Sequence, residues 1–334
     1  MRPVFIGGCE RSGTTMLGAM LAGHPDVLAV PESQFKFDAF RQIRDWEKQR
    51  VDAPAMVQKI SEHWRSEYWR PLPTPSEVED LTSYRDVIFA LVKRYAEARG
   101  HEVPSTWVDH TAANIMYLPS LVRLFPQARF IHLVRDGRAY AASLMRCDWG
   151  PVTALHAAKR WKMHLSYGLA AEGGLHAERV MRVRYEDLVS KPSALLAQIC
   201  DHLGINFRSR MEHGGQMDRA TYNEQIHALV GDAPDPDRAT AWRERLDARG
   251  IEIFESEAKE LLELMGYESI TSPGEEYPPR YHEKIKIIVQ EVVQGKIVDR
   301  VRRYIRRSKH SQKATSASQE AAAENAHQEL EPER

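Results

Sequence analysis

The amino-acid sequence predicts an α/β protein of three layers, in which helices cover both faces of a central parallel sheet. Short apolar runs with the length of buried strands alternate along the chain with segments of helical periodicity. A glycine-rich turn joins the first expected strand to the first helix, and the clearest buried strand, residues 129–134, leads directly into another helix. This alternation is typical of parallel sheets, because each parallel connection needs a crossover on one face.

The expected strands are short and apolar, and they fall at residues 4–6, 27–30, 107–108, 129–134 and 180–183. Helical periodicity is expected over residues 13–22, 35–69, 84–99, 115–124, 138–145, 154–171, 195–203 and 251–265. Gly204 is expected to end one of these helices, since glycine readily adopts the left-handed conformation of a C-cap. Residues 231–237 have the composition of a loop.

Three regions follow from these elements. Residues 1–270 form the expected catalytic domain, and residues 271–309 comprise a proline loop and a basic amphipathic helix that begins at Tyr281. The remaining segment, residues 310–334, is rich in Ser, Ala, Gln and Glu and cannot bury enough apolar surface to fold. We therefore expect it to be disordered.

Size and composition are those of a soluble globular protein. Hydrophobic residues make up 43% of the 334-residue chain and charged residues 28%. The formal net charge is -1, so no field of the whole molecule attracts nucleic acid. The three cysteines, Cys9, Cys147 and Cys200, are too scattered for a disulfide framework and include no CxxC pair, so we expect a reduced setting and no metal site.

The apolar segments predict a cytoplasmic location. The run after Met1 is too short for a signal peptide, and no stretch approaches the roughly 20 apolar residues that cross a bilayer. The basic helix over residues 281–309 could lie on the inner surface of an anionic membrane, or it could pack on its own domain and expose a solvated basic face.

The turn after the first strand has the composition of a phosphate-binding loop. Residues 8–15 have the spacing of a P-loop, whose glycines let successive backbone N–H groups point into one concavity at a helix N-terminus. Thr14 stands where NTPases have the lysine that reaches the β- and γ-phosphates. Arg11 offers positive charge instead, so the loop suits one 5′ phospho-anhydride better than a triphosphate. The alternative is a glycine-rich turn that binds no ligand.

A second anion site is expected after the strand over residues 129–134. Arg135 follows this strand at its carboxyl end, where open α/β sheets bind ligands, and a guanidinium can contact phosphate through two hydrogen bonds. Ser143 lies eight residues further (143 − 135), so only tertiary folding could bring both to one phosphate. Arg135 alone could equally pair with Asp136. Together with the first loop, this site describes a nucleotide phosphorylated at its 5′ and 3′ positions.

In these two motifs the chain resembles the sulfotransferases that use 3′-phosphoadenosine 5′-phosphosulfate (PAPS), and among them the tyrosylprotein sulfotransferases and their bacterial relatives. The similarity extends over about residues 4–267 and is strongest over 5–32 and 123–143. The resemblance implies a P-loop-like fold, PAPS as donor and PAP as product. It also implies that the 5′-phosphosulfate is bound by Arg11, Ser12, Gly13, Thr14 and Thr15, and the 3′-phosphate by Arg135 and Ser143.

The resemblance assigns two more residues to the nucleotide. Tyr185 begins a segment, residues 185–188, that is similar to a family segment near the nucleotide, although a tyrosine here could also be ordinary core packing. Thr240, two residues before Trp242, matches a serine that contacts the cofactor in the tyrosylprotein branch, and threonine keeps the hydroxyl.

The resemblance also identifies candidate catalytic residues. Glu32 matches the general base of the tyrosylprotein branch, and His110 stands where that branch has a catalytic lysine. Some cytosolic sulfotransferases use histidine as base, so the base could be Glu32 or His110. In the arrangement we favour, Glu32 takes the acceptor proton while Arg11, His110 and Thr14 stabilise the bridging and sulfuryl oxygens. Glu32 could instead cap the next helix, and His110 could be a buried, hydrogen-bonded histidine.

The predicted function is transfer of a sulfuryl group from PAPS to a hydroxyl of a glycan, a lipid or a peptide tyrosine. The segment between residues 35 and 107 is expected to shape the acceptor site, and its aromatic and charged side chains suit all three. Two alternatives stay open: a small-molecule kinase with an altered P-loop, which Thr14 disfavours, and a nucleotide-binding scaffold without activity. Neither nucleic acid nor a particular oligomeric state is indicated.

Overall fold

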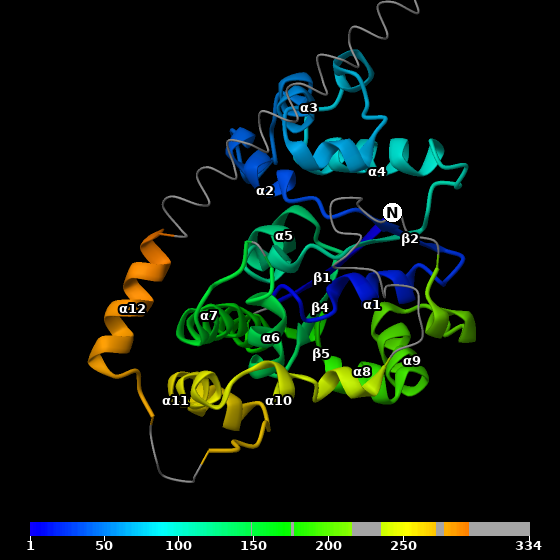
Figure 1. Ribbon diagram of the computed structural model, residues 1–334. Helices are drawn as coiled ribbons and strands as arrows, with labels where there is room; N and C mark the ends of the chain where they lie inside the picture. Colours follow the sequence, from blue (N-terminus) through cyan, green and yellow to red (C-terminus); the bar gives the residue numbers. More distant parts are fainter. Residues whose placement is uncertain (148, 175–176, 216–234, 272–276, 294–334) are drawn as a thin grey trace, which may run out of the picture.

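A computed structural model describes residues 1–147, 149–174, 177–215, 235–271 and 277–293 (Figure 1). Within them, five parallel strands form one sheet of order β2-β3-β1-β4-β5. The strands are β1 (Arg2–Gly8), β2 (Val27–Val30), β3 (Thr106–Asp109), β4 (Arg129–Val134) and β5 (Val180–Arg184). All five expected strands are confirmed, and β2 and β4 have the expected bounds.

Helices cover both faces of the sheet, which confirms the three-layer α/β fold. On one face, α1 (Thr14–Leu21) and α9 (Pro192–Leu203) pack on inward-facing residues that include Val4 and Ile6 of β1. On the other, α4 (Tyr84–Glu97) and α5 (Leu118–Leu124) pack on Phe5, and α7 (Ala154–Glu172) contacts β1 and β5. Burial on both faces explains why the strands are apolar at successive positions rather than alternating.

The other helices are α2 (Phe35–Ala39), α3 (Ala53–Ser61), α6 (Gly137–Leu144), α8 (Tyr185–Ser190), α10 (Trp242–Arg245), α11 (Ala248–Leu264) and α12 (Tyr281–Val292). Side-chain caps begin several of them: Ser83, Thr153 and Asp247 accept hydrogen bonds from backbone N–H groups in the first turns of α4, α7 and α11. Gly204 ends α9 with a φ of 66°, as expected.

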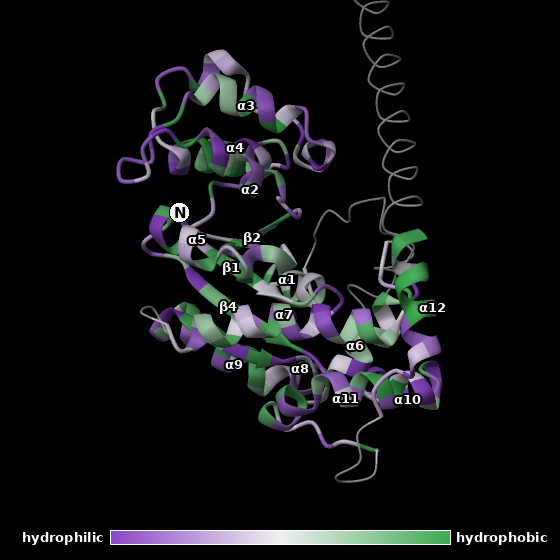
Figure 2. Ribbon diagram, turned by 90° about the vertical axis from the view of Figure 1, so that its left-hand side faces the viewer, coloured by the Kyte–Doolittle hydropathy of each residue, from purple (hydrophilic) through white to green (hydrophobic). Residues whose placement is uncertain are grey.

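The segment over residues 35–69 differs from the sequence prediction of one helical region. It is divided into α2, a 3-10 turn (Phe40–Gln42), α3 and a second 3-10 helix (Trp64–Trp69). The chain folds back here because its aromatic side chains pack on one another: the rings of Phe35 and Trp69 meet edge to face at 5.4 Å. Figures 1 and 2 show α2, α3 and α4 gathered beyond the β2 edge of the sheet, at the opposite end of the molecule from α10 and α11.

Two other boundaries differ for reasons of local chemistry. The helix expected over residues 115–124 is a 3-10 turn (Ala112–Ile115) followed by α5, which has a proline in its first turn. Likewise α9 begins at Pro192 rather than Leu195. Proline is favoured in the first turn of a helix, because the N–H that it lacks has no partner there.

The C-terminal region is described only in part. The basic helix expected over residues 281–309 is present as α12, and residues 294–309 and the tail over 310–334 lie outside the described residues. Arg249 of α11 holds the first turn of α12 through hydrogen bonds of 3.0 and 2.7 Å to Glu283. In the part of the chain that is described, no helix combines the length and apolarity needed to span a bilayer.

Candidate functional site

The glycine-rich turn between β1 and α1 has a backbone that its neighbours fix tightly. Gly13 has a φ of 97°, and a Cβ there would lie 2.8 Å from the ring of Tyr185. At Gly8, a Cβ would lie 2.2 Å from the carbonyl oxygen of Leu133 on the adjacent strand. Both positions therefore require glycine, one for its conformation and one for the close approach of β4.

The same turn presents polar groups that fit an anion. The side-chain hydroxyl of Ser12 is fully buried and has no hydrogen-bond partner among the described residues. Thr14 and Thr15 form the first turn of α1, where backbone N–H groups point out of the helix. A buried hydroxyl without a partner is costly, so a phosphate or sulfate oxygen in this position would satisfy it.

Tertiary folding brings the second predicted anion motif to the first. Arg135 Nη1 donates a hydrogen bond of 2.8 Å to the carbonyl oxygen of Arg11, and Arg11 Nε donates one of 3.3 Å to Ser143 Oγ. Arg135 and Ser143 thus meet at Arg11, although two helical turns of α6 separate them. Arg135 Nη2 also donates to the carbonyl oxygen of Arg238 at 3.2 Å.

Two partly buried guanidinium groups therefore lie at one place. Burial lowers the pKa of Arg11, and the charge of Arg135 lowers it further. Burial likewise lowers the pKa of Arg135, whose Nε has no hydrogen-bond partner within the described part of the chain. Arginine stays protonated in proteins, so two partly buried cations at one place favour a ligand with more than one negative charge.

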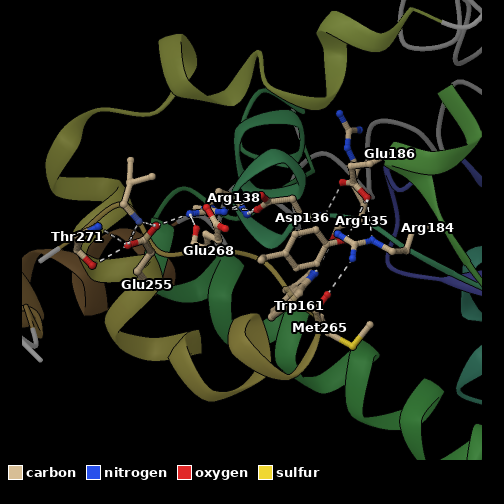
Figure 3. A network of polar contacts seen from close by, with 12 residues as sticks. Arg135, Asp136, Arg138, Trp161, Arg184, Glu186, Glu255, Met265, Glu268 and Thr271 are labelled. Atoms are coloured by element: carbon tan, nitrogen blue, oxygen red, sulfur yellow. Dashed lines mark hydrogen bonds and ion pairs between the residues drawn. The ribbon is translucent and has the colours of Figure 1, made fainter. Parts of the chain in front are cut away.

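A network of hydrogen bonds and ion pairs fixes the backbone next to Arg135 (Figure 3). Its carbonyl oxygen accepts from Trp161 Nε1 at 3.1 Å, and the next N–H, that of Asp136, donates to Glu186 Oε1 at 2.9 Å. Asp136 forms an ion pair of 2.8 Å with the buried Arg138. The backbone on both sides of Arg135 is thereby tied down, so the network determines where its guanidinium points.

Tyr185 contacts the Arg135 guanidinium, whereas Thr240 only lies in a segment next to it. Tyr185 is buried at the start of α8, and its ring covers the Arg135 guanidinium at 4.2 Å. Thr240 has an exposed side chain that donates to the carbonyl oxygen of Asp237 at 3.3 Å. It follows a 3-10 helix (Pro236–Ala239) that contacts Arg135 through Arg238, so its segment adjoins the site.

Glu32 and His110 follow β2 and β3, beside the end of β1. Glu32 forms an ion pair of 2.5 Å with Arg65 of the second 3-10 helix. It does not cap α2, whose N-cap residue is Gln34, and that alternative interpretation is wrong. The charge of Glu32 acts on both neighbours, since it raises the pKa of Arg11 and of His110 against the larger lowering effect of burial.

His110 is a buried side chain, 4% exposed, with an imidazole held against α1. A Cβ at Gly18 of α1 would lie 3.1 Å from its Cδ2. Burial lowers the pKa of His110, which favours the neutral imidazole. Its Nδ1 has no hydrogen-bond partner among the described residues, so the site leaves this nitrogen available to a ligand.

Three residues beside Glu32 and His110 have no counterpart in the sequence prediction. Arg65 pairs with Glu32, and Lys36 pairs with Asp109 at 2.8 Å in a buried ion pair. Arg65 is distant in sequence from Glu32 and has no motif around it, so no local signal identifies it. Lys36 lies four residues after Glu32, a spacing that would place both side chains on one face of a helix. This signal is weak, because α2 begins only at Phe35 and does not include Glu32.

Comparisons with known proteins found similar sequences and similar folds. A family model described as the sulfotransferase family matches residues 3–209. A putative protein-tyrosine sulfotransferase of Caenorhabditis briggsae is 24% identical over 215 residues, which covers 63% of this chain and 68% of that protein. Protein-tyrosine sulfotransferase 1 of Danio rerio is 26% identical over 225 residues, covering 63% of this chain and 55% of the relative. The chain thus spans about two thirds and about half of their lengths.

Solved structures share the fold. The sulfotransferase domain of the Synechococcus PCC 7002 olefin synthase superposes with a TM-score of 0.60 and 25% sequence identity, over 80% of this chain and 95% of that one. The sulfotransferase domain from the curacin biosynthetic pathway superposes with a TM-score of 0.57 at 21% identity, over 80% and 99% of the two chains. Both cover this chain well beyond the two anion motifs.

Proposed function

Because this chain belongs to the sulfotransferase family, a family of sulfuryl-transferring enzymes, we propose that it uses PAPS as donor, transfers the sulfuryl group to a hydroxyl acceptor and releases PAP. The observation that carries this proposal is the meeting of Arg11, Arg135 and Ser143 beside the buried hydroxyl of Ser12. A nucleotide with phosphate groups at both ends of its ribose supplies the two anions that such a site needs.

The residues of the turn and of β4 would bind the nucleotide. In this proposal the 5′-phosphosulfate lies against Arg11 and Ser12, at the turn that Gly13, Thr14 and Thr15 complete. Arg135 and Ser143 hold the 3′-phosphate. Tyr185 supports Arg135 through ring contact, and Thr240 offers its hydroxyl from the neighbouring segment.

The reaction is a transfer between two oxygens. A bond forms from the acceptor oxygen to sulfur, the bond from sulfur to the bridging phosphate oxygen breaks, and the acceptor proton goes to a base. Such transfers depend mainly on positioning and on stabilising charge at the leaving oxygen. We assign the base to Glu32, and the stabilisation of charge to Arg11, Thr14 and an N–H of His110.

The acceptor is a hydroxyl compound, and the named relatives favour a peptide tyrosine over a glycan or a lipid. They are protein-tyrosine sulfotransferases. Aromatic side chains in the segment after Glu32 suit a ring: Trp64, next to Arg65 in the chain, is 37% exposed, and Phe37 of α2 stacks on Tyr117 at 4.1 Å.

The C-terminal helix is part of the proposal. Five exposed side chains form an apolar stripe on α12, namely Tyr281, Ile285, Ile288, Val289 and Val292. Figure 2 colours much of this helix as hydrophobic. The sequence continues with seven Lys or Arg and a single Asp over residues 296–309. Apolar area combined with positive charge suits an anionic lipid surface, so we place the enzyme in the cytoplasm, in contact with the inner membrane surface.

Nucleotide binding distinguishes the proposed sulfotransferase from the two alternative functions, a kinase and a scaffold. We expect PAP to bind in isothermal titration calorimetry, while ATP with magnesium shows at least about 100-fold weaker affinity because Thr14 cannot replace the P-loop lysine. PAPS with labelled sulfur, incubated with an extract of the source cells, should label the acceptor. Preferred binding of ATP would indicate a kinase instead. Binding of PAP without transfer to any acceptor or to water would indicate a scaffold.

A further inference from the structure

A buried ion pair lies between the two segments that carry Glu32 and His110. Lys36 of α2 and Asp109 at the end of β3 are 2% and 0% exposed, and Lys36 Nζ lies 2.8 Å from Asp109 Oδ2. Lys36 Nζ also donates to Ser33 Oγ at 2.9 Å. The pair is therefore in contact with the residue that follows Glu32, and Asp109 is the residue that precedes His110.

The Asp109 carboxylate joins the two segments. Ser33 Oγ donates to Oδ2, while the N–H and hydroxyl of Thr111 donate to Oδ1 at 2.9 and 2.6 Å. Ser33 and Thr111 are also joined directly, since the N–H of Ser33 donates to Thr111 Oγ1 at 2.9 Å. Asn114 Nδ2 contacts Oδ1 at 3.3 Å and donates to the carbonyl oxygen of Ile6 in β1 at 3.0 Å. The ends of β1, β2 and β3 thus meet at one carboxylate.

The Asp109 carboxylate is ionised despite its burial. Burial raises the pKa of Asp109, but the Lys36 ammonium and the hydroxyls of Ser33 and Thr111 outweigh it and bring the pKa to about 2. Burial lowers the pKa of Lys36, and Asp109 opposes this change. An ion pair of this kind adds little stability over a well-packed apolar pair of the same volume, because both charges lose their hydration. Its presence between two candidate catalytic residues calls for a role other than stability.

We propose that Lys36 and Asp109 are positioning residues, which fix Glu32 and His110 relative to each other by clamping the residues next to them in the chain. The contacts of both charged groups are with protein groups around them, so we assign them no direct contact with a substrate. The inference rests on the proposed function, because it concerns the geometry in which that reaction occurs. If the inference is right, the reaction needs a rigid connection between the ends of β2 and β3 in addition to the PAPS site.

The test uses hydrolysis of PAPS, in which water replaces the unidentified acceptor. Thr111→Val keeps the volume of this buried side chain but removes the hydroxyl that joins Ser33 to Asp109. At saturating PAPS we expect its hydrolysis rate to fall by about 10- to 100-fold, the effect of a small displacement of reacting groups, while the dissociation constant of PAP stays within about twofold. Lys36→Met combined with Asp109→Asn removes both charges. It should likewise lower the hydrolysis rate and leave the dissociation constant of PAP unchanged.

Tyr84→Phe is the matched control. Tyr84 is equally buried, and its hydroxyl donates to the carbonyl oxygen of Lys36 at 2.9 Å. The variant loses one buried hydrogen bond in the same region, but it leaves the contacts among Ser33, Asp109 and Thr111 unchanged, so its hydrolysis rate should equal that of the wild type. Wild-type rates in Thr111→Val, or equal losses in Thr111→Val and Tyr84→Phe, would overturn the inference. A wild-type protein that neither binds PAP nor hydrolyses PAPS would instead contradict the proposed function.

Discussion

Glu32 shows how a single residue depends on a partner far away in the chain. Its carboxylate lies at the end of β2, but Arg65, which holds it at 2.5 Å, comes from the aromatic segment beyond α3. The candidate base and the segment that we propose to shape the acceptor site are therefore linked by one ion pair. An acceptor that approaches this carboxylate meets Arg65 as well.

We predict that Glu32→Gln lowers the rate of sulfuryl transfer by about 10²- to 10⁴-fold, because the amide cannot take the acceptor proton. The affinity for PAP, measured by calorimetry, should not change. Glu62→Gln is the control, since Glu62 is an exposed glutamate that pairs with Lys59 on the surface. Turnover close to normal in Glu32→Gln would assign the base to His110.

At the scale of elements, the junction of β4 and α6 depends on α11 (Figure 3). Arg138, in the first turn of α6, forms ion pairs with Asp136 and with Glu255 of α11. Glu255 is 2% exposed and also accepts hydrogen bonds from the backbone N–H groups of Ile270 and Thr271. One buried carboxylate thus joins the motif that positions Arg135 to the C-terminal end of the main domain.

Glu255→Ala is therefore predicted to lower the free energy of unfolding by about 3–5 kcal/mol, since it leaves the Arg138 charge buried with one partner fewer. Urea denaturation followed by circular dichroism measures this change. Glu257→Ala on the same helix is the control, because Glu257 is partly exposed and pairs with Lys162, so it should cost at most about 1 kcal/mol. Equal losses in the two variants would show that the network of Figure 3 stabilises the fold no more than a partly exposed ion pair does.

At the scale of the whole molecule, α12 leaves much of its surface exposed. Its first turn is tied to Arg249, and its apolar stripe is open, with Tyr281 80% and Ile288 59% exposed. Several large apolar side chains exposed side by side are typical of a surface that contacts a partner.

We predict that the full chain co-sediments with vesicles that contain phosphatidylserine but not with purely zwitterionic vesicles, and that added salt weakens this binding. Ile285→Asp combined with Ile288→Asp should abolish it. Leu264→Asp, at an exposed position of α11, should not. Negligible co-sedimentation at every salt concentration would contradict membrane contact.

The sequence by itself determined the parallel α/β fold and the two anion motifs. Strand and helix patterns are local, and a glycine-rich turn or an arginine at a strand end needs only its neighbours to be recognised. For the same reason the sequence predicted Arg11, Ser12 and Arg135 as one nucleotide site, and the structure brings Arg11 and Arg135 into contact. Resemblance to a family pointed further, to Glu32 and His110.

Only the tertiary structure decided what surrounds the candidate catalytic residues. It divided residues 35–69 into short helices, because aromatic contacts such as that of Phe35 with Trp69 outweigh local helical preference. It also brought Arg65 to Glu32 and Lys36 to Asp109, pairs that no local pattern could indicate. A buried charge needs a partner from wherever the fold supplies one, so the choice of that partner depends on packing and not on spacing along the chain.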